Sequence, residues 1–139
     1  MWGAQVGLAN DFPGVTIICD HCGCPTMVGS YKNKRDEIFA QWKLDMAELA
    51  KCPNVVVKVG GMTMPYSGFG WELRDAPPSS AELAEGLAPW YMFLVSTFGP
   101  ERCMFVRPRF VKPISSACAS CQLQSVQLVA NRRLKSVGG

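Results

Sequence analysis

Asn54-Val55-Val56-Val57-Lys58-Val59-Gly60-Gly61 is the stretch of this sequence that decides the fold. Four valines around one lysine are typical of a β-strand, and a glycine pair is a common strand end. Two further apolar runs, residues 15–19 and 102–106, have the same character. Because these runs are nearly continuous, they predict strands buried on both faces, as in a parallel sheet.

Helical patterns separate the three strand candidates. Residues 36–51 place apolar side chains on one face at helical spacing. These side chains are Ile38, Phe39, Trp42, Met46, Leu49 and Ala50. A second helix is predicted over residues 80–97, because Ser79 and Glu82 have capping-box spacing; Pro89 is expected to break or kink it. Alternating strands and helices predict an α/β fold built from right-handed βαβ units.

The composition is that of one globular domain. The chain has 139 residues, of which 48% are hydrophobic and 18% charged. The longest apolar run, residues 87–95, is too short to span a membrane. The first residues carry no export signal, so we expect a cytoplasmic protein whose cysteines are reduced. Seven cysteines also exclude a complete set of disulfides.

Charge divides the chain near its end. All 11 acidic residues lie within residues 1–101, whereas half of the 14 basic residues lie within 102–139. We therefore expect residues 106–139 to form an irregular basic tail, disordered or weakly helical, or a segment of different origin. Nucleic-acid binding by this tail is disfavoured, because it has one aromatic residue, Phe110, and no recognised binding motif.

Two Cys-x-x-Cys pairs allow a structural zinc site. Cys19 and Cys22 form one pair, and Cys118 and Cys121 form the other. Against this alternative, far more residues separate the pairs than in a zinc ribbon, and Cys19 lies in a predicted buried strand. A redox role is disfavoured as well, since Cys19 ends a strand rather than preceding a helix. The remaining alternative is a structural role, in which these cysteines act as small hydrophobic residues.

Cys19-Asp20-His21-Cys22-Gly23-Cys24-Pro25 contains the only histidine of the chain. It follows the first predicted strand, and α/β enzymes place their chemistry at the carboxyl ends of parallel strands. His21 is therefore a candidate catalytic residue. A structural role is the competing interpretation, because a lone histidine is more often structural.

Three blocks of sequence resemble one family of hydrolases. TIICDHCGCP is similar to the strand and His-x-Gly-x-Pro stretch of the amidohydrolase-related family, the TIM-barrel hydrolases that include several lactonases. KCPNVVVKVGGM resembles the next strand of that family, and FGPERCMF resembles the start of its eighth strand. The resemblance implies that residues 1–105 form part of a (β/α)8 TIM barrel, about its last three strands with their helices.

The resemblance also implies a site. His21 corresponds to the family's sixth-strand histidine, which would hold water or substrate, shuttle a proton, or bind a metal. Asp20 would orient that site locally, and a catalytic role for it is the lesser alternative. The family commonly uses a divalent metal, often zinc, to activate water against a lactone, ester or amide carbonyl, although some members use none. The implied substrate is a small carbonyl-containing acid or lactone.

Two departures from the family pattern weaken this expectation. The family's His-x-His pair is absent, since His21 is the only histidine, and Pro108 stands where the family commonly has an aspartate. We therefore expect a C-terminal fragment that has negligible activity by itself. The alternative to a metal in this chain is that it binds none. The alternative is a non-catalytic truncated relative that self-associates through exposed sheet edges. For residues 106–139 the hypothesis is an altered reading frame, an alternative splice or a mis-called exon, which transcript and genomic sequences would test.

Overall fold

The computed structural model describes residues 3–106. Its three strands form one parallel sheet in the order β1-β2-β3, as the sequence predicts. The strands are β1 (Ile17–Cys19), β2 (Val55–Val59) and β3 (Cys103–Phe105). The α-helices are α1 (Gly3–Asp11), α2 (Arg35–Ala50) and α3 (Ser80–Phe98). None of the helices within residues 3–106 combines the length and apolar character needed to cross a membrane.

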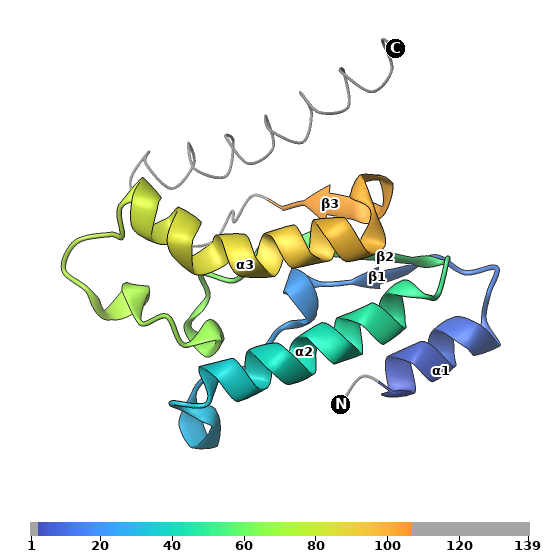
Figure 1. Ribbon diagram of the computed structural model, residues 1–139, viewed down its shortest axis with the longest axis horizontal. Helices are drawn as coiled ribbons and strands as arrows, with labels where there is room; N and C mark the ends of the chain where they lie inside the picture. The colour runs from blue at the N-terminus through green and yellow to red at the C-terminus, as the bar shows by residue number, and fades with distance from the viewer. Residues whose placement is uncertain (1–2, 107–139) are drawn as a thin grey trace, which may run out of the picture.

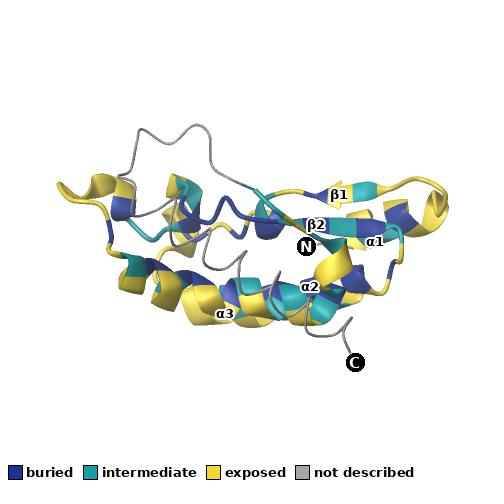
Figure 2. Cartoon of the chain, turned by 90° about the horizontal axis from the view of Figure 1, so that it is seen from above, coloured by how far each residue is buried: buried dark blue, intermediate teal, exposed yellow. Residues whose placement is uncertain are grey.

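The sheet and its helices form two layers. Figures 1 and 2 show α2 and α3 side by side along one face of the sheet. Val55, Val57 and Val59 on β2 are at most 2% exposed, whereas the alternating Val56 and Lys58 are only half-buried. The valines therefore face the helices, and Lys58 faces the opposite side.

That opposite side of the sheet is exposed in the described part of the chain. Ile18 on β1 pairs in register with Val56, and its side chain is 51% exposed. Met104 on β3 pairs with Lys58 and is 37% exposed. The expectation of strands buried on both faces is therefore wrong for residues 3–106, because α2 and α3 cover the same face.

Aromatic side chains fill the space between α2 and α3. Trp42 and Trp90 are each 3% exposed, and their ring centroids lie 4.8 Å apart. Phe39 stacks on Trp42 at 5.7 Å, and Phe93 approaches Trp42 at 5.5 Å. The apolar face predicted for residues 36–51 is thus confirmed, and burial of this face stabilises both helices against the sheet.

Helix α3 runs without a break through Pro89. Proline removes the hydrogen bond to the carbonyl of Glu85, and both residues are exposed, so water can solvate that carbonyl. Leu87 and Trp90, which flank Pro89, are buried and hold the helix on the core. The predicted break at Pro89 is therefore wrong, and the alternative, a kink, stays a prediction.

Helix α1 is an element that the sequence did not predict. Its buried residue is Ala9, which is 1% exposed, and Val6 packs against the core beside it. The side-chain amide of Asn54 lies at the end of α1 and donates to the carbonyls of Ala9, Phe12 and Val15 at 3.0–3.1 Å. Asn54 therefore ties the segment before β1 to the start of β2.

Glu82 makes stability depend on pH at the start of α3. Its carboxylate accepts from the backbone N–H of Ser79 (2.8 Å) and from Arg74 (2.7 Å), and these contacts lower its pKa to about 2. Because the folded pKa lies below the ordinary value of 4.5, this stabilisation is present above pH 4.5 and is lost as the pH falls toward 2. We expect Glu82→Gln to flatten this part of the pH profile of the urea midpoint. An unchanged profile would contradict the assignment.

Candidate functional site

The segment after β1 forms a left-handed turn, which we call the histidine turn (residues 20–24). The φ angles of His21, Cys22, Gly23 and Cys24 are +46°, +55°, +75° and +50°. Glycine adopts this conformation freely, whereas for each other residue it costs about 1 kcal/mol of conformational free energy. Three non-glycine residues within one turn of four are therefore stable only where surrounding contacts hold them, and such strain is common at functional sites.

Cys22 supplies those contacts at the middle of the turn. Its side chain is fully buried, and Sγ both donates to the carbonyl of Gly60 and accepts from the N–H of Gly60, each at 3.4 Å. The carbonyl of Cys22 accepts a hydrogen bond from Trp42 Nε1 at 2.8 Å. The turn is thereby joined both to the end of β2 and to α2.

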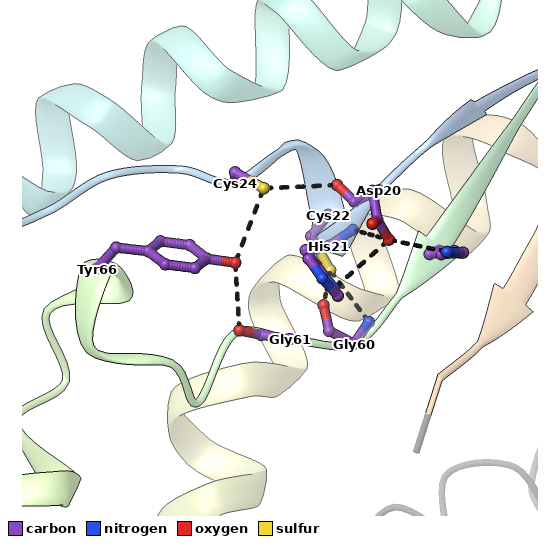
Figure 3. A network of polar contacts seen from close by, with 8 residues as sticks. Asp20, His21, Cys22, Cys24, Gly60, Gly61 and Tyr66 are labelled. Atoms are coloured by element: carbon purple, nitrogen blue, oxygen red, sulfur yellow. Dashed lines mark hydrogen bonds and ion pairs between the residues drawn. The ribbon is translucent and has the colours of Figure 1, made fainter. Parts of the chain in front are cut away.

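His21 lies between Asp20 and Gly61 (Figure 3). Its Nδ1 is 3.5 Å from Asp20 Oδ1, and the side chain is 28% exposed. Nδ1 itself is buried and makes no hydrogen bond to any described residue, so its approach to Asp20 is a charge contact. The imidazole also packs against the bare Cα of Gly61, where a Cβ atom would lie 2.6 Å from Nδ1. The ring is thus restricted on two sides.

Lys58 is a site residue that the sequence did not single out. Its Nζ lies 3.2 Å from Asp20 Oδ1, the oxygen that also accepts from the backbone N–H of His21 at 3.1 Å. Lys58 is the one charged residue in the apolar stretch of β2, and its alternation with the buried valines places it on the open face. That isolated charge was the signal available in the sequence.

Tyr66 and Cys24 extend the site along the loop after β2. The Tyr66 hydroxyl lies 3.4 Å from the carbonyl of Gly61 and 3.8 Å from Cys24 Sγ, and Cys24 Sγ lies 3.8 Å from the carbonyl of Asp20. Burial, with a smaller effect of Cys24, raises the pKa of Tyr66 well above its usual range. Tyr66 is therefore a neutral hydroxyl at ordinary pH, able to donate one hydrogen bond.

A family model for amidohydrolases matches residues 3–105. The chain belongs to the amidohydrolase family. The uncharacterized protein y4mH of Sinorhizobium fredii is 31% identical over 98 residues, which are 70% of this chain. This chain spans 26% of that relative, about a quarter of its length.

Two crystal structures of an amidohydrolase from Burkholderia multivorans have the same fold as this chain. One holds HEPES and the other zinc, and their TM-scores to this chain are 0.66 and 0.65 at 22% identity. Each match covers 92% of this chain but only 41% and 40% of the solved chains. The predicted architecture, part of a (β/α)8 TIM barrel, is confirmed.

The buried cysteines of this amidohydrolase chain do not favour the zinc-binding alternative. Cys22 Sγ is engaged with both backbone groups of Gly60, and within residues 3–106 no third ligand joins Cys19 and Cys22 to hold an ion. The other predicted pair, Cys118 and Cys121, lies outside the described residues, as does Pro108. A zinc site shared by the two pairs stays a prediction.

A divalent metal in the family is suggested by the zinc-bound neighbour, and His21 is the predicted ligand here. Within residues 3–106, no three histidine, cysteine or carboxylate side chains are placed to hold one ion together. The nearest carboxylate to His21, that of Asp20, is already paired with Lys58. The described residues do not by themselves fit a metal centre, so we assign no chemical step to one.

Proposed function

We propose that this chain contributes one edge of the active site of a hydrolase acting on small carbonyl-containing molecules, such as lactones, esters or amides. Membership of the amidohydrolase family and the placement of His21 at the carboxyl end of β1 support the proposal. The described cysteines are free thiols, which suits a cytoplasmic protein, and that location is part of the proposal.

The observation that carries this proposal is the approach of His21 Nδ1 to Asp20 Oδ1, at 3.5 Å. A neutral imidazole protonated at Nδ1 would direct that N–H at Asp20 and leave Nε2 to accept a proton from water or substrate. Asp20 would then select the tautomer, as carboxylates beside catalytic histidines commonly do. Lys58 would hold the Asp20 carboxylate in place through Oδ1, the same oxygen that the imidazole approaches.

The tautomer gives a direct test, because the full chain has one histidine and its imidazole signals need no assignment. We expect the ¹⁵N shifts of neutral His21 to report the Nδ1–H tautomer in the full chain. In Asp20→Asn, the preference should weaken, since an amide is a poorer acceptor than a carboxylate. An Nε2–H tautomer in the unmodified chain would contradict the proposed direction of proton transfer.

The chain alone is expected to show negligible hydrolysis. One histidine with a paired carboxylate is an incomplete constellation, and no described cluster can bind the ion that would activate water. We therefore expect lactone, ester and amide turnover with added Zn²⁺ to equal that of His21→Ala. Metal-dependent turnover that disappears in His21→Ala would show that this chain is a complete enzyme.

A non-catalytic role through association is the second candidate. The open face of the sheet exposes Ile18 and Met104, and apolar surface of this kind favours contact with another chain. Size-exclusion chromatography with light scattering on the purified chain tests whether it associates. Concentration-dependent oligomers would support association, whereas a monomer at all concentrations would argue against it.

A further inference from the structure

The buried Cys22 thiol has a position in the histidine turn that its neighbours lack. It is the central non-glycine residue of the left-handed run, directly after His21. We propose that Cys22 is a positioning residue, whose contact with Gly60 fixes the backbone from which the His21 imidazole projects. The proposal rests on the function proposed above, but it concerns geometry that can be measured without any turnover.

The contact with Gly60 is reciprocal, which suits a thiol. A thiol has one hydrogen to donate and lone pairs to accept, and the backbone of Gly60 offers one acceptor and one donor. Both residues are buried, so an unsatisfied peptide group would have no water to replace the lost bond. Sulfur forms these bonds at 3.4 Å, a length at which a hydroxyl oxygen would bond poorly.

The adjacent residues Gly60 and Gly61 link the Cys22 contact to the position of the His21 ring. Cys22 binds the peptide of Gly60, while the His21 ring rests on the Cα of the next residue, Gly61. One short segment after β2 therefore holds both the backbone and the side chain of the histidine. Figure 3 shows Cys22 and His21 together above this segment.

Trp42 provides a second anchor for Cys22. Its indole N–H donates to the carbonyl of Cys22 at 2.8 Å, from a side chain that is 3% exposed. The turn is thus fixed at the Cys22 side chain by β2 and at the Cys22 carbonyl by α2. Loss of either anchor should release the left-handed conformers, which are unfavourable for residues other than glycine.

Cys19 is a matched control two residues before His21. It is a buried free cysteine like Cys22, 6% exposed against 0%, and burial raises both thiol pKa values to about 12. In register it lies beside Val57 on β2 rather than at the turn. A substitution at Cys19 therefore removes a buried thiol without removing the contact with Gly60.

The test compares Cys22→Ala, Cys22→Ser and Cys19→Ala in the full chain by NMR of the His21 imidazole and of the amides of residues 21–24. In Cys22→Ala we expect relaxation dispersion to reveal other turn conformers at about fivefold higher population, the factor for a net loss of about 1 kcal/mol from the two weak thiol bonds together. Cys22→Ser should restore part of the native signal, because serine can donate to Gly60 in a slightly shifted turn. Cys19→Ala should leave the imidazole signals in place even if it lowers the urea midpoint.

Cys22→Ser keeps the proposal falsifiable if Cys22→Ala does not fold, because its altered contact with Gly60 should still shift the His21 signals; Trp42→Phe tests the second anchor of the turn. Phenylalanine retains an aromatic ring in the core but cannot donate to the Cys22 carbonyl, so the same conformers should appear. Unchanged His21 signals in Cys22→Ala, or equal changes in Cys19→Ala, would overturn the proposal. Absence of hydrolysis would overturn only the proposed function, since these signals do not depend on substrate.

Discussion

Replacing Arg102 with alanine is expected to lower the free energy of unfolding by about 3 kcal/mol, more than replacement of any other charged residue described. Its guanidinium donates from Nε to the carbonyl of Phe98 (2.9 Å), from Nη1 to Cys52 (3.0 Å) and Val55 (3.4 Å), and from Nη2 to Ala50 (3.0 Å). One side chain therefore satisfies carbonyls at the ends of two helices and at the start of β2.

The size of this effect follows from the partners that Arg102 gives to backbone carbonyls otherwise without one. The last carbonyls of a helix have no partners within it, and Ala50 ends α2. A positive charge there also interacts favourably with the helix dipole. Alanine would leave these partly buried carbonyls to a few water molecules, which is why the expected loss is a large share of the stability of a small domain.

Arg74 is the control for Arg102, and urea denaturation followed by tryptophan fluorescence is the measurement. Arg74 pairs with Glu82 at 2.7 Å, but both side chains are 47% exposed, so Arg74→Ala should cost less than about 1 kcal/mol. Arg102→Lys should fall between the two alanine variants, because lysine keeps the charge but loses the planar set of donors. Equal losses at positions 74 and 102 would contradict the role assigned to Arg102.

The strands and long helices could be predicted because their signals are local. The valines of β2 and the apolar face around Trp42 follow the periods of strand and helix, and both are buried as expected. Helix α1 has no comparable pattern; it is held by contacts such as that of Asn54 with Ala9, which join residues far apart in sequence. Such a helix cannot be predicted from the residues within it.

The candidate site was predictable in its residues but not in its geometry. Asp20 and His21 are adjacent in sequence, and the strand before them indicated where they would lie. The left-handed run could not be predicted, since two of its residues are cysteines that normally avoid positive φ. Their conformation depends on Gly60 and Trp42, which lie 38 and 20 residues from Cys22.

The open face of the sheet carries part of the candidate site. Lys58 projects toward the face that also exposes Ile18 and Met104, and Asp20 lies within 3.2 Å of its ammonium group. In a closed barrel this face would be the interior, where side chains of other strands pack. The Coulombic attraction between Lys58 and Asp20 would be stronger there, because solvent screens it less, while removal of both charges from water would offset part of that gain.

Replacing Gly61 with alanine should disturb His21 more than any other single methyl group added to a described glycine. The φ of Gly61 is +81°, and a Cβ atom there would lie 2.6 Å from Nδ1, 2.7 Å from Cγ and 2.9 Å from Cβ of His21. We expect a loss of about 1 kcal/mol from the backbone conformation and about 2 kcal/mol more from the overlap. The imidazole should move away from Asp20, and the tautomer preference set by that carboxylate should be lost.

Gly70→Ala separates the two contributions. Gly70 has a similar φ of +70°, but no other atom lies within 4 Å of the position of its added Cβ. It should therefore show only the backbone loss of about 1 kcal/mol in urea denaturation and leave the ¹⁵N shifts of His21 unchanged. If Gly61→Ala and Gly70→Ala lowered stability equally and neither shifted the imidazole signals, Gly61 could not be what confines the histidine. A shift in Gly61→Ala alone would show that the bare Cα of Gly61 is part of the site itself.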